Sequence, residues 1–413
     1  MAHRLRRHDN ARVDDSAART VTAVVTLDGE RLGQVGPFPV PTARWQDVAP
    51  VARELEQRLE VPVLVLRLVG ASGGEGCSGG HVVYHAEAVQ RPELPLADGT
   101  VQLTEDPLRA AWARADGLRA ALDWAGATLR VAGRPATGPV EQLRTWNLSG
   151  LVRIPTADGP VWLKTTPPFG ADEAGPIALI ASVDGGLVPT VLGSAPGQLL
   201  LDHVPGVDCW GLPDDAMLGA VARTVAAQAR LAGVTDHGLR DGSPHRLAEQ
   251  VALLLPRIDA LTADERTAAQ RLLDRLPDRI AALEACGLPE TLVHGDFHPG
   301  NWRADGERTV VVDFSDAHHG HPAFDGLRPR AFLRPERWAD VRAVWAGAWS
   351  AAVPGSDPLR ALDLARPLMH LAYAVRYQEF LDGIELSERV YHEDDPADEV
   401  RRALAAAAQD TAG

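Results

Sequence analysis

The sequence predicts an α+β protein, because strand-like and helical segments occupy different stretches of the chain. Short apolar runs separated by Gly- and Pro-rich turns recur up to residue 203. From Pro213 onward helical spacing dominates, interrupted by a loop and hairpin over residues 292–314. At roughly 150 residues per domain, the length of 413 residues suggests two or three domains.

Composition excludes several classes of protein. Hydrophobic residues make up 45% and charged residues 23%, as in ordinary globular chains. The net charge of −15 repels phosphate backbones and anionic lipid headgroups, so we expect neither nucleic acid nor membranes as partners. Cys77, Cys209 and Cys286 are isolated, which fits neither a disulfide framework nor a zinc knuckle. With no apolar signal segment near the first residue, these features predict a cytoplasmic protein.

The first part of the chain reads as a small accessory domain. Residues 1–20 are charged and aperiodic, which predicts a disordered tail. Strands are expected at 21–27, 62–69 and 81–89, and a helix within 45–59, so an α/β accessory domain is predicted over 21–135. A further helix is expected at 108–124, followed by a Gly/Pro-rich linker at 131–139.

Two motifs in this accessory domain are interpreted as inactive. Gly74, Gly76 and Gly79 satisfy GxGxxG, but a strand follows them where a dinucleotide-binding fold needs a helix, so a hairpin loop is predicted. The stretch 53–55 (REL) faintly resembles part of a Nudix box, yet Gln57 and Arg58 stand where that box needs metal-binding glutamates. A degenerate, Nudix-like or cap domain is therefore our interpretation, and Nudix hydrolysis is disfavoured.

The rest of the chain divides into a strand-rich and a helical part. Strands are expected at 140–143, 151–154, 161–164, 190–192 and 198–203, with a helical run beginning near Glu173. Helices are expected at 217–231, 245–255 and 264–286, and from residue 334 to the end. We therefore predict an N-lobe over 136–204 and a helical C-lobe over 205–413.

Lys164 is the only lysine among the 41 basic residues, and it ends a predicted strand. A chain so biased toward arginine is expected to keep a lysine where a guanidinium cannot replace it. The ammonium is a compact point charge, whereas the guanidinium is a wide planar fork. Lys164 is therefore a candidate for binding a phosphate group.

The segment 292–316, LVHGDFHPGNWRADGERTVVVDFSD, carries the clearest chemical signal. It places Asp296 five residues before Asn301, and Asp313 at the end of an apolar strand. Phosphoryl transfer needs a carboxylate that orients the attacking hydroxyl and oxygen ligands that hold Mg²⁺. The D-x4-N spacing equals that of the kinase catalytic loop, and the later Asp before Phe corresponds to the metal-binding Asp of D-F-G.

This constellation resembles the aminoglycoside phosphotransferase and choline kinase family. That family's H-G-D-x-H-x-x-N motif stands here as His294, Gly295, Asp296, His298 and Asn301. The resemblance covers residues 140–400. It implies a protein-kinase-like, two-lobed fold with a small antiparallel β N-lobe and a mostly helical C-lobe.

The resemblance also implies roles for individual residues. Asp296 would be the catalytic base or hydroxyl-orienting residue, and Asn301 and Asp313 would ligate Mg²⁺. The nucleotide, ATP or GTP, would contact the following residues: Lys164 as phosphate clamp with Glu173 as its partner, Ser149 in the loop over the phosphates, and Asp202 and Val204 in the hinge at the base.

Other polar residues near the motif receive plainer interpretations. His294 and His298 are expected to shape the loop through hydrogen bonds rather than to bind metal. Asp325, in GHPAFD, is expected to brace the catalytic loop. The run 318–321 (HHGH) lacks two further ligands at a plausible spacing, which disfavours zinc. The loop TWNLSG is not a glycine-rich phosphate loop, and Ser315 replaces the glycine of D-F-G.

The substrate is expected to be a small molecule. Protein kinases place an activation segment and an A-P-E motif after D-F-G, whereas HHGHPAFDG follows Asp316 directly. The predicted acceptor is a hydroxyl of an aminoglycoside-like antibiotic, a sugar or an amino alcohol. The acidic residues at 393–395 and 398–399 could line an acceptor pocket, although a solvated acidic face explains them more simply. A catalytically silent pseudokinase that acts as a nucleotide-binding or regulatory module is the alternative.

Overall fold

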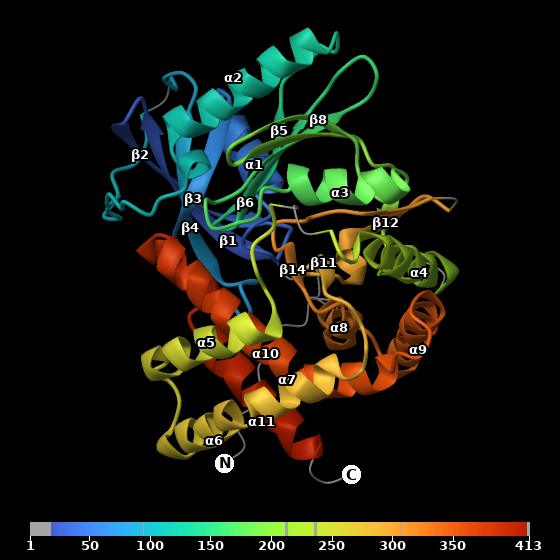
Figure 1. Ribbon diagram of the computed structural model, residues 1–413. Coiled ribbons are helices and arrows are strands. Elements are labelled where there is room, and N and C mark those ends of the chain that lie inside the picture. Colours follow the sequence, from blue (N-terminus) through green and yellow to red (C-terminus); the bar gives the residue numbers. More distant parts are fainter. Residues whose placement is uncertain (1–17, 94, 211–213, 235–237, 307, 411–413) are drawn as a thin grey trace. The chain divides into compact units, whose positions relative to one another are not determined.

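The computed structural model describes residues 18–93, 95–210, 214–234, 238–306 and 308–410 (Figure 1). Residues 1–17 of the predicted tail lie outside this part of the chain. The described residues form two compact units. The first unit contains the residues up to 170, 190–203 and 381–393, and the second contains 171–189, 204–380 and those from 394 onward.

A four-stranded sheet opens the first unit, with the strand order β2-β1-β4-β3. Its strands are β1 (Arg19–Leu27), β2 (Glu30–Val40), β3 (Val63–Ser72) and β4 (His81–Ala88). β1 and β4 run parallel, and the other two pairs are antiparallel. Helix α1 (Ala49–Leu59) buries Val51, Leu55 and Leu59 in the same core as the sheet.

The sequence analysis did not predict β2, which contains Pro37 and Pro39. A proline cannot donate to a β-ladder, so it argues against a central strand. β2 tolerates both residues because it stands at the edge of the sheet. The predicted hairpin loop is confirmed: β3 and β4 pair from Ser72 with His81, and Gly74, Gly76 and Gly79 lie in the loop between them.

A second sheet of the first unit is antiparallel throughout, with the strand order β5-β6-β7-β9-β8. Its strands are β5 (Glu141–Trp146), β6 (Ser149–Ile154), β7 (Val161–Thr165), β8 (Val191–Ala195) and β9 (Gln198–Asp202). Helix α2 (Ala115–Val131), preceded by the short η1 (Ala111–Ala113), packs Ala121, Ala125 and Leu129 on this sheet. The predicted helix at 108–124 therefore begins later and runs into the predicted linker.

Side chains join the two sheets of the first unit. The Gln142 amide accepts the Val65 N–H at 2.8 Å and donates to the Val65 carbonyl at 2.6 Å, as a strand neighbour would. The Thr145 hydroxyl donates to the Leu66 carbonyl at 3.1 Å. Both sheets therefore fold as parts of one unit.

A segment from near the end of the sequence, residues 381–393, also belongs to the first unit. It contains η5 (Leu386–Tyr391), whose Tyr391 ring packs edge-on against Trp45 and Trp146. Glu385 pairs with Arg67 at 3.1 Å. The sequence analysis assigned this segment to the helical C-lobe, because nothing local marks where a distant core accepts it.

The buried Glu388 carboxyl of this segment makes stability depend on pH. Burial raises the pKa of Glu388 from 4.5 to about 8, and Glu385 adds to the shift while the Leu68 N–H opposes it. Between these pH values the folded chain holds a proton that the unfolded chain has lost, so stability falls as pH rises from 4.5 through about 8. Each pKa unit is worth about 1.4 kcal/mol.

We therefore expect Glu388→Gln, which is neutral at every pH, to gain stability relative to the native chain as pH rises. Urea unfolding across this pH range measures the difference in the free energy of unfolding. Glu393→Gln, at an exposed position of the same segment, is the control and should follow the native curve. Parallel curves for the native chain and Glu388→Gln would contradict the prediction.

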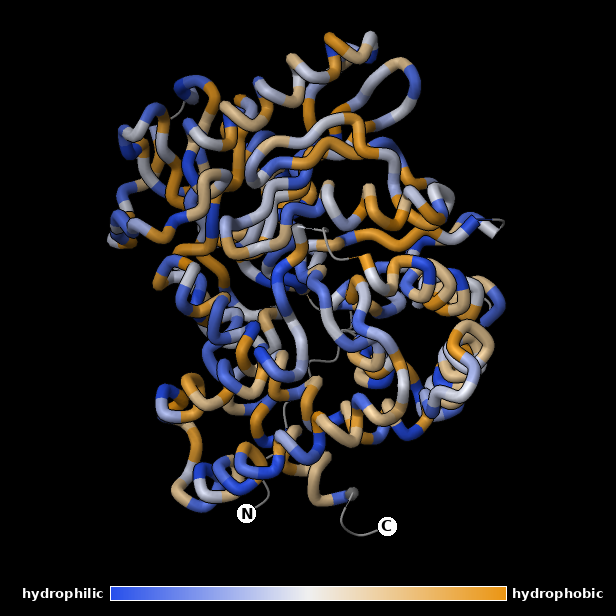
Figure 2. The backbone as a smooth tube through the Cα atoms, viewed as in Figure 1, coloured by the Kyte–Doolittle hydropathy of each residue, from blue (hydrophilic) through white to orange (hydrophobic). Residues whose placement is uncertain are grey.

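The second unit is mostly helical. Its helices are α3 (Ala174–Asp184), α4 (Asp214–Leu231), α5 (Pro244–Leu254), η2 (Leu255–Arg257), α6 (Ala263–Asp274), α7 (Leu276–Glu284), η3 (Pro299–Asn301), α8 (Ala323–Leu327), η4 (Arg328–Ala331), α9 (Pro335–Ala352), α10 (Pro358–Gly383, whose last residues enter the first unit) and α11 (Asp395–Asp410). Figure 2 shows hydrophobic and hydrophilic residues alternating along several of these helices, as expected where one face packs on a core. The prediction of a single helix over 264–286 is wrong. This stretch forms two helices, α6 and α7, because Pro277 stands in the first turn of α7.

Two small sheets in the second unit hold the motif region. β10 (Val207–Asp208), β12 (Trp302–Ala304) and β13 (Thr309–Val311) form one sheet, and β11 (Thr291–Val293) pairs with β14 (His318–Gly320) in the other. Trp302, the first residue of β12, is fully buried. Within the described ranges no helix is long and apolar enough to cross a membrane.

Candidate active site

A buried carboxylate, Asp325 of α8, holds the backbone of the loop that follows β11. Its Oδ2 accepts the His294 N–H at 2.8 Å and the Gln228 side-chain amide at 2.7 Å, and its Oδ1 accepts the Gly295 N–H at 3.0 Å. Asp325 is only 1% exposed. The predicted role of Asp325 as a brace of this loop is confirmed.

Gly295 allows the sharp path of the loop. Its φ of +86° lies in the left-handed region, and a Cβ at this position would collide with the Asp316 carbonyl oxygen. The Tyr373 hydroxyl donates to the Gly295 carbonyl at 2.7 Å. The loop is therefore tied both to α8 and to α10.

The two histidines of the motif shape the loop, as predicted. His294 Nε2 lies 3.0 Å from the Val312 carbonyl, and His294 Nδ1 accepts the Asp296 N–H at 3.2 Å. His298 Nε2 lies 3.1 Å from Asp296 Oδ2, and His298 Nδ1 accepts the Gly300 N–H at 3.1 Å. All four ring nitrogens thus have partners, three within the loop and one at Val312 after β13. In the described part of the chain, no group of three or more His, Cys, Asp or Glu residues could hold a metal ion.

The Asp296 carboxylate lies at the centre of this loop and is surrounded by donors. Its Oδ1 accepts from Arg328 Nε at 2.8 Å. Its Oδ2 contacts both the His298 ring and the Asn301 side-chain nitrogen, the latter at 3.2 Å. Burial alone would raise the pKa of Asp296, but the His298 ring and the Arg328 guanidinium outweigh it and hold that pKa well below its usual range. Asp296 is therefore ionised, and as a weak base it is better suited to orienting a hydroxyl than to removing its proton early.

Asn301 and Asp313 present a donor set that suits Mg²⁺. The Asn301 side-chain nitrogen donates to Asp296, which leaves the amide oxygen to face another group, and the Asn301 carbonyl accepts the Val312 N–H at 2.9 Å. Asp313, the next residue, has a φ of +69°, and its Oδ1 accepts from the Ser315 hydroxyl at 2.9 Å. Strained backbone at a non-glycine residue clusters at functional sites. One amide and one carboxylate oxygen fit an ion that binds through few protein ligands plus phosphates.

Glu173, just before α3, contacts the same region. Its Oε2 accepts the Phe314 N–H at 2.9 Å, and the side chain is 4% exposed. Glu173 thus lies beside the D-F element within the second unit, together with Asp296, Asn301 and Asp313.

The other predicted nucleotide contacts are distributed over both units. Lys164 lies on β7 of the first unit and is 8% exposed. Ser149 begins β6 of that unit, and its hydroxyl accepts from Trp146 Nε1 at 3.0 Å. Asp202 ends β9 and pairs with Arg134 at 3.1 Å, whereas Val204 belongs to the second unit, where its carbonyl accepts from Arg303 at 3.4 Å.

The acidic residues near the end of the chain differ in exposure: Glu393 and Asp394 are exposed, whereas Asp395 and Glu399 are buried. Asp395 is 5% and Glu399 is 3% exposed. Glu399 pairs with His370 at 2.7 Å and with Arg402, because a buried charge needs a partner. A solvated face therefore describes Glu393 and Asp394 but not Asp395 and Glu399, and none of these four residues lines the pocket described next.

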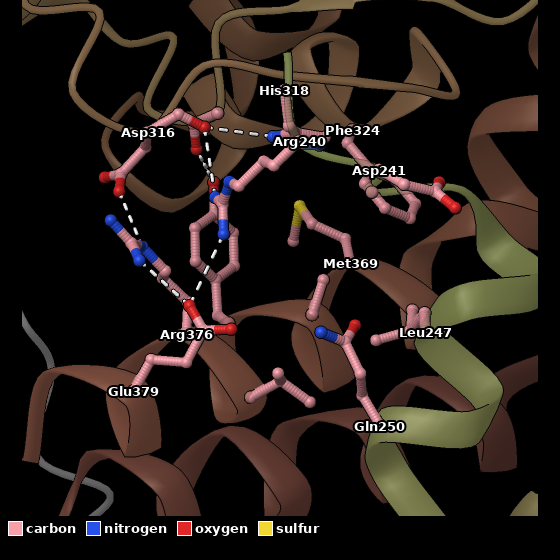
Figure 3. A pocket seen from close by; sticks show the side chains of 15 residues that line it. Arg240, Asp241, Leu247, Gln250, Asp316, His318, Phe324, Met369, Arg376 and Glu379 are labelled. Carbon is pink, nitrogen blue, oxygen red and sulfur yellow. Dashed lines mark hydrogen bonds and ion pairs between the residues drawn. The ribbon is translucent and has the colours of Figure 1, made fainter. Parts of the chain in front are cut away.

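A pocket that is partly open to solvent adjoins the motif loop, residues 294–301 (Figure 3). Gly295 and Asp316 line it on the loop side, and the α10 residues Tyr373, Arg376 and Glu379 line it on another. Arg376 pairs with Asp316 at 2.8 Å and with Glu379 at 2.9 Å. Figure 3 shows this ion-pair network on one side of the cavity, with Met369 and Leu247 on the other.

Sequence reasoning missed Arg328, Tyr373 and Arg376. Arg328 follows Asp325 by three residues, so one turn of helix carries both the brace and the partner of Asp296. Among so many arginines, nothing local distinguishes Arg328 or Arg376.

Part of the chain matches a known protein family. Residues 171–362 match the profile of the phosphotransferase enzyme family. This confirms the family resemblance carried by the motif. No curated protein matches the chain. Phosphoryl transfer is thus the class of reaction that the family supports.

This chain is also similar to solved structures. A protein of Ralstonia eutropha JMP134 assigned as an aminoglycoside phosphotransferase is 16% identical, with a TM-score of 0.51 over 70% of this chain and 98% of that chain. The choline kinase LicA of Streptococcus pneumoniae is 13% identical, with a TM-score of 0.49 over 70% and 98% of the two chains. The macrolide 2'-phosphotransferase MphH of Brachybacterium faecium is 18% identical, with a TM-score of 0.46 over 66% and 97%. The Ralstonia structure, together with the antiparallel sheet and the helical region described above, confirms the predicted protein-kinase-like α+β fold.

Proposed function

We propose that this protein transfers the γ-phosphoryl group of ATP or GTP to a hydroxyl of a small molecule. Two hydrogen bonds carry the proposal. The Asn301 side chain donates to the Asp296 carboxylate, and the Asn301 carbonyl accepts the N–H of Val312, the residue before Asp313. These contacts join a carboxylate suited to orienting a hydroxyl to two candidate oxygen ligands for a metal. The family match over residues 171–362 supports the same reaction class.

In the proposed reaction the acceptor oxygen forms a bond to the γ-phosphorus while the bond from that phosphorus to the β–γ bridging oxygen breaks. The Asp296 carboxylate orients the hydroxyl and receives its proton late, as its depressed pKa implies. Asn301 and Asp313 would hold Mg²⁺, which neutralises phosphate charge when bound. Lys164 would bind the phosphate oxygens of the nucleotide, with Glu173 as its partner. Ser149 would lie in the loop over the phosphates. Asp202 and Val204 would form the hinge at the base of the nucleotide.

Phosphorus NMR of the purified protein with ATP or GTP, Mg²⁺ and pooled hydroxyl compounds tests the proposal. A new phosphomonoester that forms as the nucleoside diphosphate appears is the expected result. Nucleotide binding without turnover would instead indicate a silent pseudokinase. Cleavage of the nucleotide without a phosphomonoester would indicate a hydrolase.

Lys164→Arg is expected to weaken nucleotide binding although it keeps the charge. The side chain is nearly buried on β7, and the wider guanidinium does not fit a site shaped for an ammonium. Loss of one charge-assisted hydrogen bond costs about 1.5–3 kcal/mol, or roughly 10- to 100-fold in Kd. Calorimetry with ATP and Mg²⁺ measures the change, and Arg153→Lys, at an exposed position of the neighbouring strand β6, is the control. Equal affinity in the Lys164→Arg variant would remove Lys164 from the site.

A further inference from the structure

We propose that Tyr373 is a positioning residue for phosphoryl transfer, because this one side chain holds both the backbone and the carboxylate of Asp296. The inference rests on the proposed function and adds to it a residue that acts through Asp296. All the residues that carry it belong to the second unit.

The backbone just before Asp296 has to be fixed from outside the loop. Gly295 has a φ of +86°, and glycine has more backbone freedom to lose than any other residue. Its N–H donates to Asp325 Oδ1 at 3.0 Å, and its carbonyl accepts from the Tyr373 hydroxyl at 2.7 Å. Side chains of α8 and α10 thus hold both polar groups of Gly295.

The Gly295 carbonyl belongs to the peptide group that carries the Asp296 N–H. This peptide group is planar and includes the Asp296 Cα, so these atoms move together. The Asp296 N–H donates to His294 Nδ1 at 3.2 Å. The Tyr373 and His294 contacts therefore hold opposite edges of one plane, and the place of the Asp296 Cα depends directly on the Tyr373 hydroxyl.

The Tyr373 ring acts on the Asp296 carboxylate through Arg328. The Arg328 guanidinium carbon lies 4.3 Å from the centre of the Tyr373 ring. Arg328 Nε and Nη2 in turn reach Asp296 Oδ1 at 2.8 and 2.7 Å. Stacking on an aromatic face suits a planar guanidinium, so the ring helps to fix the plane in which both N–H groups point.

The Tyr373 hydroxyl keeps the proton that this role needs. Burial raises the pKa of Tyr373 well above its usual value, and the Asp296 charge adds to the shift while Arg328 opposes it. A carbonyl can only accept, so the contact with Gly295 requires a protonated hydroxyl as donor.

Arg376 secures the neighbouring segment from the same part of α10. It follows Tyr373 by three residues, a spacing that places two side chains side by side on a helix, and it pairs with Asp316 at 2.8 Å (Figure 3). A Cβ at Gly295 would collide with the Asp316 carbonyl oxygen, so these two backbones are in contact. One turn of α10 thus holds both the motif loop and the segment that follows Asp313.

Tyr373→Phe tests the inference, because it removes the hydroxyl and keeps the ring. Turnover with ATP and Mg²⁺ is measured on glucose, choline and kanamycin, one compound for each predicted class of acceptor. For every compound that the native chain phosphorylates, kcat should fall by about 10- to 100-fold, since a displacement of about 1 Å at a reacting group has an effect of this size. The acceptor KM and the Kd for ATP should stay the same, as for an interaction used only in the transition state.

Tyr84→Phe is the matched control. The Tyr84 hydroxyl on β4 also donates to a backbone carbonyl, that of Trp45, but in the first unit, and the side chain is fully buried. Each substitution removes one hydrogen bond from a tyrosine to the backbone, so each should lower the melting temperature slightly. Only Tyr373→Phe should lower kcat.

Two further measurements separate the hydroxyl from the ring. Hydrogen exchange of the peptide 293–298 should become faster in Tyr373→Phe and stay native in Tyr84→Phe, which tests the anchoring of the loop without any acceptor. Tyr373→Leu also removes the stacking partner of Arg328, so its kcat should fall by about a further tenfold.

The outcomes distinguish this inference from the proposed function. A native kcat in a folded Tyr373→Phe variant would overturn the inference and leave the proposed function intact. An equal loss of kcat in Tyr84→Phe would make Tyr373 a structural residue only. Absence of turnover by the native chain with all three compounds would contradict the proposed function and the inference together.

Discussion

Replacing Asp296 by Asn is expected to lower kcat by about two to four orders of magnitude while leaving the Kd for nucleotide unchanged. The amide has nearly the size of the carboxylate, but it has one acceptor oxygen where Asp296 has two. The Asp296 oxygens serve Arg328 on one side and His298 with Asn301 on the other, so the amide cannot satisfy all three. The hydroxyl of the acceptor then loses its orienting partner.

The same substitution leaves the Arg328 charge without its carboxylate, so some loss of thermal stability is expected as well. The double variant Asp296→Asn with Arg328→Gln separates the two effects, since it removes both charges at once. It should recover melting temperature but not turnover. Turnover, nucleotide Kd and melting temperature are measured on one preparation of each variant.

Two outcomes would contradict this account. Full activity of Asp296→Asn would exclude the proposed mechanism. A joint loss of activity, nucleotide affinity and fold that the double variant does not relieve would make Asp296 a structural residue only.

Asp313→Asn is expected to abolish detectable turnover and to remove the effect of Mg²⁺ on nucleotide binding. Asparagine tolerates the left-handed backbone that Asp313 adopts, so this variant removes the charge with little strain. Alanine at a φ of +69° would add about 1 kcal/mol of strain and confuse the result. A neutral amide is a poor substitute for a carboxylate ligand of Mg²⁺.

Thermal unfolding with ATP, in the presence and absence of Mg²⁺, measures this effect. A ligand that binds only the folded chain raises its melting temperature by mass action. The native chain should be stabilised further when Mg²⁺ is added, whereas Asp313→Asn should not. Asp305→Asn, at an exposed position of the hairpin between β12 and β13, is the control. Stabilisation of Asp313→Asn by Mg²⁺ to the native extent would exclude Asp313 as a metal ligand.

The local contacts of the motif loop, residues 294–301, were predictable because its parts lie close together in the sequence. His294, Asp296, His298 and Asn301 fall within eight residues, so the hydrogen bonds among them follow from one local backbone path. The strand that leads to Asp313 is likewise a continuous apolar run. For the same reason the interpretation of GxGxxG as a hairpin was correct: the strand that follows it is visible in the sequence.

Local patterns failed where partners are far apart or where an element breaks a propensity rule. β2 contains two prolines and is stable only because it lies at a sheet edge, which no local pattern reveals. Residues 381–393 pack with strands near residue 70 because Glu385, Glu388 and Tyr391 find burial and partners there. Where residues 381–393 pack therefore depends on the folded core of the first unit and not on their own local sequence.

The sequence by itself predicted the reaction class and the candidate residues of the motif loop, since spacing within a short loop carries that information. Only the tertiary structure decided that Arg328 partners Asp296, that Tyr373 binds the Gly295 carbonyl, and that Arg376 pairs with Asp316. The physical reason is that a buried charge must be paired, and which of many arginines pairs with it is settled by packing between helices distant in the sequence.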